Sequence, residues 1–184
     1  MSLISRIKLE NWWNGQLPVY REALSKGDLS VIPDLYSVFG SSKGTRSEAH
    51  HKKKAAALLC ACLELLDCRE LMALLDRFGY SSRMEWFVDW REQRPADFLT
   101  PDMTPAERFW VLALATAHSC GFLREKAFSA LAHEDDPRIV GMALLGLCDH
   151  VGQVRRAAEG LLTAKLKTVT PAALWGSIPY ALPV

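Results

Sequence analysis

The chain has 184 residues, 49% of them hydrophobic and 23% charged, and a formal net charge of +1. This length and composition are typical of one globular domain with a sizeable core, and so small a net charge gives no general attraction to nucleic acid or anionic membranes. The longest apolar run, residues 55–63, is much shorter than the roughly 20 residues that cross a bilayer, and the N-terminus lacks the apolar core of a signal peptide. We therefore expect a cytoplasmic protein.

The five cysteines have no spacing typical of a disulfide scaffold, so free thiols in a reducing compartment are expected. Cys60 and Cys62 lie two positions apart in a predicted helix, where their side chains point in different directions and cannot share a metal ion. A further set flanks two predicted turns: His118, Cys120, Cys148 and His150. Because His and Cys at the ends of helical repeats are usually structural, the sequence predicts neither a metal nor a cofactor.

The N-terminal residues 1–46 are predicted to cap a helical domain. Residues 1–16 carry two adjacent tryptophans and form either part of that cap or an arm that docks on a partner. Two short helices follow at about 17–26 and 29–39, each interrupted by a proline and ended by a glycine. The Gly- and Ser-rich residues 40–45 are expected to form a flexible connector.

Two longer helices are predicted after this connector. Apolar residues at helical spacing over 58–66 give the first, which begins at Ser47, a broad apolar face. Asp67 and Glu70 have the spacing of a capping box and mark the start of the second, which ends at Gly79. The two helices are expected to form an antiparallel hairpin, a degenerate early copy of the repeat described below.

The middle of the chain combines a short aromatic helix, predicted at about 82–90, with an irregular stretch at 93–103 that contains two prolines. Residues 104–107, Thr-Pro-Ala-Glu, are the clearest helix start in the sequence, since they combine an N-cap Thr, a Pro at the first helical position and a Glu two positions later. The almost wholly apolar residues 109–117 that follow predict a central helix covered on several sides.

Residues 119–166 contain one helical unit twice. An Arg follows the first apolar residue of each copy, Arg124 in one and Arg155 in the other. Three apolar positions recur about 31 residues apart: Leu123, Ala127 and Leu131, then Val154, Ala158 and Leu162. Asp136-Pro137 predicts the start of the helix between the copies. A helical unit recurring at this interval indicates a stacked-helix solenoid, in which each unit buries its apolar face against its neighbours.

Within this stretch, residues 149–158 (DHVGQVRRAA) resemble the second half of a HEAT-repeat turn and helix, and residues 121–131 (GFLREKAFSAL) resemble a variant of the same helix. Residues 136–140 (DPRIV) are similar to the opening of the partner helix. The resemblance covers about residues 118–166 and implies an α-solenoid that binds a partner along a concave surface. It implies no particular ligand, because many unrelated proteins share this fold.

The resemblance also implies roles for the arginines of the repeats. In HEAT-like units the Arg after the apolar residue pairs with an Asp at the turn, which assigns Arg155 to Asp149 in a ladder between units and gives Arg124 a similar structural role. Arg138 and Arg156 lie outside any such ladder and are therefore predicted to bind a partner.

The densest basic patch is residues 50–54, His-His-Lys-Lys-Lys. Lys52, Lys53 and Lys54 are candidates for contacts with nucleic-acid phosphates, which would make binding salt-sensitive. The alternative, which we favour, is that they form the solvated first turns of an otherwise apolar helix, although cations are slightly unfavourable near a helix N-terminus.

Trp86, Asp89 and Trp90, flanked by Arg83 and Arg91, form the sharpest functional hypothesis. A HEAT-like solenoid with exposed Trp, a carboxylate and nearby Arg is similar in outline to the alkylpurine DNA glycosylases, in which aromatic residues and an Asp stabilise the developing sugar cation. The near-neutral net charge argues against a DNA-encircling face, and packing of both indoles between helices is the favoured alternative. Trp86 and Trp90 are retained as candidate binding residues.

The last 17 residues, 168–184, contain no charged side chain and include one Trp and one Tyr. Because the terminal unit of a solenoid needs a polar outer face to stay soluble, this segment is expected to lie against its own chain, a second copy, or further repeats of a longer protein.

Together these features predict one all-α domain, a HEAT-like α-solenoid of stacked antiparallel helix pairs with about eight or nine helices. Residues 1–46 would cap it, residues 47–166 would form the repeats, and residues 167–184 the apolar C-terminal segment. The predicted function is non-catalytic binding of an unidentified protein on the concave helical face, through aromatic and Arg anchors. Two alternatives stay open: a nucleic-acid-binding or glycosylase-like enzyme, and an oligomerisation domain of a longer protein or a homodimer formed through the C-terminal segment.

Overall fold

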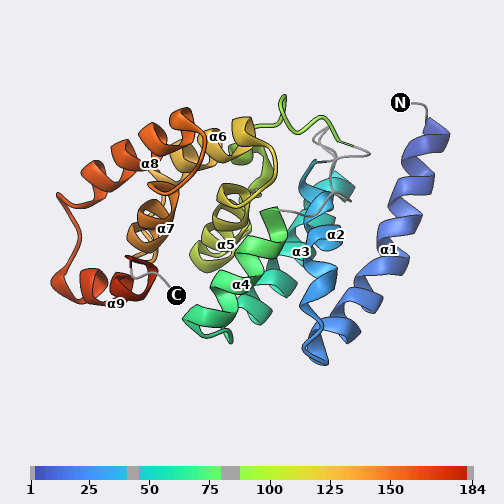
Figure 1. Ribbon diagram of the computed structural model, residues 1–184. Coiled ribbons are helices and arrows are strands. Elements are labelled where there is room, and N and C mark those ends of the chain that lie inside the picture. Colours follow the sequence, from blue (N-terminus) through green and yellow to red (C-terminus); the bar gives the residue numbers. More distant parts are fainter. Residues whose placement is uncertain (1–2, 41–45, 80–87, 182–184) are drawn as a thin grey trace.

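The computed structural model describes residues 3–40, 46–79 and 88–181, and every regular element within those ranges is a helix. The prediction of an all-α protein is confirmed (Figure 1). The helices follow one another along the molecule, from α1 at one end to α8 and α9 at the other. No described helix is long and apolar enough to cross a membrane.

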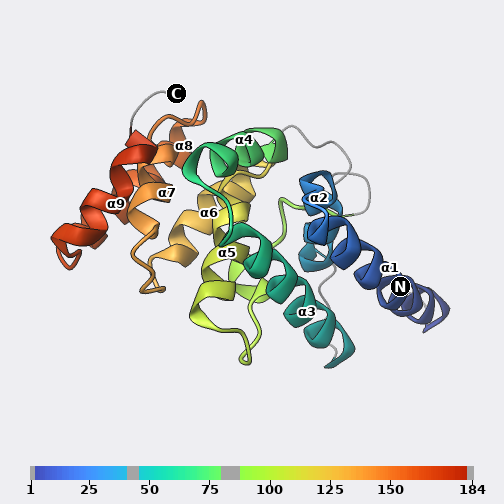
Figure 2. The ribbon, with the colours of Figure 1, turned by 90° about the horizontal axis from the view of Figure 1, so that it is seen from below.

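The odd-numbered helices form one row, in which each member packs against the next. This row comprises α1 (Leu3–Ser25), α3 (Arg46–Leu63), α5 (Pro105–Thr116), α7 (Ile139–Gly146) and α9 (Pro171–Ala181). The even-numbered helices are α2 (Ile32–Tyr36), α4 (Cys68–Gly79), α6 (Gly121–Leu131) and α8 (Gly152–Lys165). Helix α6 packs on both α5 and α8, and α7 packs on α8. When the molecule is turned by 90° and seen from below, α2, α4 and α8 lie on one side of α3 and α5 (Figure 2).

The N-terminal helix is longer than the sequence predicted. Instead of a short helix at 17–26, α1 is one helix that passes through Pro18. A proline inside a helix removes one backbone hydrogen bond, so tertiary contacts must hold the two halves together. Helix α1 packs on α3, and three residues at helical spacing on either side of the proline are buried: Trp13, Leu17 and Tyr20. Gly27, which has a φ of 78°, closes the turn after α1 as predicted.

The segment predicted as a helix at 29–39 consists of three short helical pieces: η1 (Leu29–Val31), α2 and η2 (Ser37–Gly40). The aromatic helix predicted at about 82–90 falls largely on residues 80–87, outside the described ranges, and its described residues 88–90 are not helical. The irregular stretch predicted at 93–103 is confirmed, apart from one 3₁₀ turn, η4 (Pro95–Phe98).

The two helix starts that the sequence marked with a Glu are confirmed. At α5, Thr104 Oγ1 accepts the Glu107 N–H at 3.2 Å, and the Glu107 carboxylate accepts the Thr104 N–H at 2.7 Å. At α4, Asp67 and Glu70 form the same reciprocal pair, at 2.8 and 3.0 Å. Each pair satisfies two backbone donors that the first turn of a helix leaves without an intrahelical partner.

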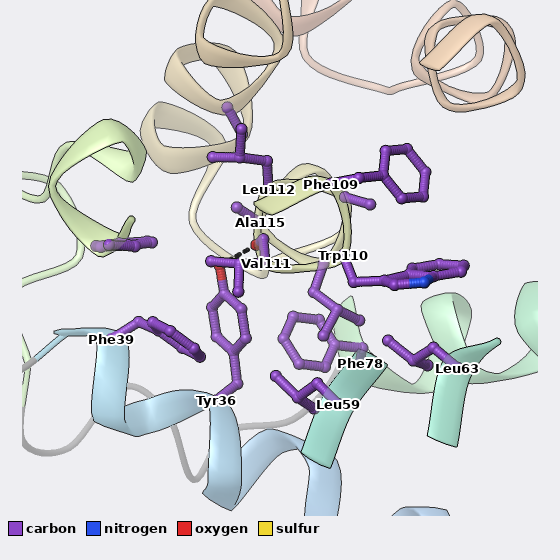
Figure 3. Packing of buried hydrophobic residues seen from close by; sticks show 14 of the residues in the cluster. Tyr36, Phe39, Leu59, Leu63, Phe78, Phe109, Trp110, Val111, Leu112 and Ala115 are labelled. Atoms are coloured by element: carbon purple, nitrogen blue, oxygen red, sulfur yellow. Dashed lines mark hydrogen bonds between the residues drawn. The ribbon is translucent and has the colours of Figure 1, made fainter. Parts of the chain in front are cut away.

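Helix α5 lies at the centre of the core, as its sequence predicted. Its residues 109–115 are at most 3% exposed, and it packs against α3, α6 and α7. The fully buried Tyr36 of α2 donates its hydroxyl hydrogen to the carbonyl oxygen of Val111 at 2.8 Å (Figure 3). Burial raises the pKa of Tyr36 well above its ordinary value, so the phenol remains a donor. One hydrogen bond thus joins α2 to α5 inside a cluster of aromatic rings.

Gly146 gives a direct test of this packing. A Cβ atom at Gly146 would lie 2.4 Å from Phe128 Cζ and 2.7 Å from Ala158 Cβ, so the Phe128 ring or the helices themselves would have to shift. We expect Gly146→Ala to lower the free energy of unfolding by about 1–3 kcal/mol, measured by urea denaturation. Gly160 of α8 is the matched control, because a Cβ there meets nothing within 4 Å. Gly160→Ala is expected to stabilise by about 0.5–1 kcal/mol, and equal effects of the two substitutions would contradict the close packing.

Candidate functional site

The basic patch of α3 is turned largely toward the protein. His51 and Lys52 are only 3% and 5% exposed. His51 Nε2 lies 2.9 Å from Asn14 Oδ1 of α1, and Lys52 Nζ donates to the Asp97 carbonyl oxygen of η4 at 2.9 Å. Burial lowers the pKa of Lys52. These two residues therefore fasten α3 to two other segments.

The third residue of the patch, Lys53, forms an ion pair with Glu107 through the same carboxylate oxygen that caps α5. Burial raises the pKa of Glu107, but hydrogen bonds from Lys53 and Thr104 outweigh this effect, so the pKa lies below its ordinary value. Partners on other segments thus offset the unfavourable position of these cations near a helix N-terminus. His50 and Lys54 are the exposed residues of the patch.

Trp90 belongs to the core. It is 3% exposed, and its ring lies 6.1 Å from Tyr36 in a stacked arrangement, 6.2 Å from Phe98 and 4.5 Å from His118, measured between ring centroids. This placement agrees with packing between helices, the alternative that the sequence favoured. The neighbouring Asp89 is exposed and accepts a backbone N–H two residues on, at 3.1 Å. Trp86 and Arg83 lie outside the described residues.

Arg138 is held by carboxylates and aromatic rings. Its guanidinium donates to both carboxylate oxygens of Asp136, at 2.8 and 2.7 Å, and to Glu64 Oε1 at 2.6 Å. It lies over the rings of Phe109 and Trp110, at 4.4 and 4.8 Å. Burial lowers the pKa of Arg138, but Asp136 and Glu64 raise it more, so the net shift is upward.

Glu64 completes this network, because its Oε1 also accepts the indole N–H of Trp110 at 2.7 Å. Arg138 therefore joins the end of α3 to α5 and to the turn before α7. No sequence pattern pointed to Glu64, which lies 74 positions from Arg138.

The first turn of the repeat is built around His118, which is 0% exposed. Its Nδ1 accepts the Cys120 N–H at 3.0 Å, so the ring proton of the neutral imidazole is on Nε2. Nε2 has no hydrogen-bond partner among the described residues. Arg124 Nη1 donates to the carbonyl oxygens of His118 and Ser119 at 2.8 and 2.9 Å. Burial and the charge of Arg124 lower the pKa of His118 to about 4.

The second turn has the same geometry 31 positions later, with Asp149 in place of His118. Asp149 Oδ1 accepts the Val151 N–H at 2.8 Å, and Arg155 Nη1 donates to the Asp149 carbonyl oxygen at 2.7 Å. The Asp149 carboxylate also binds Arg124, with Nε to Oδ2 at 2.7 Å and Nη2 to Oδ1 at 3.0 Å. We call the contact between Arg124 and the Asp149 carboxylate the rung, since it joins the first turn to the second.

The predicted pairing of the Arg155 and Asp149 side chains is therefore wrong. The Asp149 carboxylate binds the Arg of the preceding unit, whereas the one hydrogen bond of Arg155 within the described ranges goes to the backbone of its own turn. Burial raises the pKa of Asp149, but the hydrogen bonds from Arg124 and from the Val151 N–H lower it below its ordinary value. A resemblance identified the two residue types of the rung but assigned the carboxylate to the wrong neighbour.

The last two helices present the exposed candidates. Arg156 of α8 is exposed and makes no hydrogen bond or ion pair within the described ranges. Helix α9 packs on α7, so the C-terminal segment lies partly against its own chain, as one of the three expectations had it. In α9, the side chains of Leu174, Trp175 and Ile178 are 40%, 72% and 39% exposed.

A groove of about 370 Å³ lies between η1, α2 and α4. Its lining combines the apolar side chains of Leu29, Pro33 and Leu74 with the charged side chains of Glu70 and Arg77 on α4. No pattern in the sequence predicts this groove, because it is formed by segments about 40 positions apart that no local spacing connects.

No family model, curated protein or solved structure matches this chain. Within the described part of the chain, no three His, Cys, Asp or Glu side chains lie close enough to hold a metal ion. The candidate functional surfaces are therefore judged on geometry: the groove between α2 and α4, and the exposed side of α8 and α9.

The contribution of the rung to stability can be tested by comparing substitutions at Arg124 and at the equivalent residue, Arg155. Arg124 is buried and bound to Asp149, whereas Arg155 is exposed and, among the described residues, bonds to a single carbonyl oxygen. We expect Arg124→Met to lower the free energy of unfolding by about 2–4 kcal/mol, because it leaves the Asp149 carboxylate without its cation. Arg155→Met is expected to cost less than about 0.5 kcal/mol. Similar losses for both variants in urea denaturation would contradict a rung between units.

The low pKa of His118 predicts that stability falls with acidity. In the unfolded chain His118 binds a proton below about pH 6.5, whereas in the folded protein it stays neutral down to about pH 4. The unfolded state therefore binds more protons between these values, and unfolding becomes easier by up to about 3 kcal/mol as the pH falls through this window. His118→Asn keeps an acceptor for the Cys120 N–H but cannot titrate. Urea midpoints measured from pH 7 to pH 4 should fall less steeply for this variant, and parallel curves would refute the assignment.

Proposed function

We propose that this protein is a non-catalytic, HEAT-like α-solenoid that binds another protein along the face formed by its second, even-numbered helices. The rung between Arg124 and Asp149 carries the proposal, because it links two turns, 31 positions apart, that have the same pattern of hydrogen bonds to the backbone. Repeated units that contact mainly their neighbours are the defining property of a solenoid. The row of odd-numbered helices, each packed on the next, supports the same arrangement.

The groove between α2 and α4 is the proposed binding region, since it lies between two neighbouring even-numbered helices. A lining that combines apolar side chains with one acid and one base is suited to a peptide segment that buries an apolar side chain and pairs its own charges with Glu70 and Arg77. Arg156, exposed on α8, remains a proposed contact, whereas Lys54 is exposed on α3, outside the even-numbered row. Lys52, Lys53, Trp90 and Arg138 act within the fold instead.

The same contacts weigh against the nucleic-acid alternative. Two of the three lysines that would contact phosphates are bonded to other segments of the protein. A phosphate-binding surface needs several accessible cations in one place. Binding of a protein is therefore the function that these side chains support best.

The test is affinity capture with the tagged chain from a lysate of its source organism, with and without nuclease. We expect a specific protein that survives nuclease treatment and whose recovery falls at least about tenfold with Arg77→Glu, the equivalent of about 1.4 kcal/mol. Arg69→Glu is the matched control, because Arg69 is also exposed on α4 but does not line the groove. Recovery of nucleic acid, or equal loss with both variants at unchanged helicity, would refute the proposal.

A further inference from the structure

The two copies of the repeat differ in what their arginines bind. Arg124 is 6% exposed and uses Nη1 for the carbonyl oxygens of its own turn, and Nε and Nη2 for Asp149 of the next turn. Arg155 makes the equivalent bond to its own turn but no other hydrogen bond or ion pair within the described ranges. Its side chain is exposed. In Arg124, Nε and Nη2 form the rung. In Arg155, the same two nitrogens have no acceptor among the described residues.

The two copies also differ one helical turn after the arginines, at the equivalent positions 128 and 159. Phe128 of α6 is 1% exposed and lies close to α7 at Gly146. The equivalent position in α8 is Glu159, which is exposed. The side of α8 that corresponds to the covered side of α6 thus presents a cation at Arg155 and an anion at Glu159, four positions apart and on one face of the helix.

Helix α9 and the turn before it also expose apolar side chains. Leu166 is 49% exposed, and the most exposed aromatic side chain described, Trp175, is at 72%. Helices α8 and α9 both lie at the end of the molecule opposite α1 (Figure 1). We call the exposed side chains of α8, α9 and the turn between them the end face: Arg155, Glu159, Leu166, Leu174, Trp175 and Ile178.

We propose that the end face binds a further helical unit: a helix preceded by a turn that carries an Asp or Glu, from a polypeptide segment other than the one described. The carboxylate of that turn accepts hydrogen bonds from Nε and Nη2 of Arg155, as Asp149 does from Arg124. A basic side chain of the incoming helix pairs with Glu159, and its apolar face covers Trp175.

A second copy of this chain is a poorer fit as the occupant. Its turn carboxylate, Asp149, is already bound by its own Arg124. Breaking that rung to form another would exchange one charged pair for an equivalent one, with no gain from the carboxylate. The inference rests on the repeat arrangement proposed above, but not on the groove between α2 and α4.

The experiment appends a copy of residues 149–166 to the C-terminus of the full chain. This probe supplies the turn Asp and the helix that α6 already accepts as its neighbour. The extended protein is expected to unfold about 3–8 °C above the unextended one, the range given by a charged, two-donor hydrogen-bonded pair in a domain of this size. The fluorescence contributed by Trp175, obtained by difference from Trp175→Phe, should shift to the blue as the indole is covered.

The rung predicts which changes remove this gain. Replacing the appended Asp by Ala, or Arg155→Ala, should remove most of the rise in unfolding temperature, and combining the two should remove no more. Arg156→Ala is the matched control, since the equivalent residue in the first copy is Glu125 and takes no part in the rung. A rise that survives loss of the appended Asp and of Arg155, or no rise and no fluorescence shift, would overturn the inference.

A concentration-dependent dimer of the unextended chain that Arg155→Ala dissociates would make a second copy the occupant, and would also overturn the inference. If the extension has no effect while Arg77→Glu still abolishes capture of a partner, the end face fails and the proposed function stands. If the extension behaves as expected but Arg77→Glu leaves capture unchanged, the end-face inference stands and the proposed function fails.

Discussion

The burial of α5 is the constraint on which most of the structure depends. This helix has no polar side along residues 109–115, so it cannot border water and must be covered all round. Helices α3, α6 and α7 supply the cover, and Tyr36 of α2 adds a hydrogen bond to the Val111 carbonyl oxygen. The outer helix α8 has a partly polar surface and needs cover on one side only. The chain can therefore extend outward from α5 in both directions by adding helices.

Charged side chains fix how these helices are aligned. Lys53 with Glu107, Arg124 with Asp149, and Arg138 with Glu64 each join elements that are distant in sequence. Removing one member of a partly buried pair leaves a charge without compensation, which is costly, so each pair favours one alignment of its two elements over others. Residues that a sequence search selects as ligands for a partner can thus be needed to position the helices. This role accounts for most of the basic candidates in this chain.

The parts of the structure that the sequence predicted are those set by local chemistry. The caps at Thr104 and Asp67 involve residues three positions apart, and the apolar run of α5 implies its own burial. The misses depend on distant contacts: α1 continues through Pro18 because it packs on α3, and Lys52 is buried because η4 brings the Asp97 carbonyl oxygen to it. No spacing in the sequence carries that information. The candidate site was predicted least well, since both exposed surfaces are formed by segments brought together by the fold.

Internal repetition offers a way to separate structural residues from available ones. Arg124 and Arg155 occupy equivalent positions and make the same bond to the first carbonyl oxygen of their own turns, so their contacts beyond the turn can be compared directly. Where that neighbour is present, the Arg is buried and bonded to a carboxylate; where the described chain provides none, the same residue is exposed. The replacement of Phe128 by Glu159 shows that the second surface is not a simple continuation of the first, because an apolar contact has become a charged one. The proposed end face would therefore select its neighbour through two charges as well as through its shape.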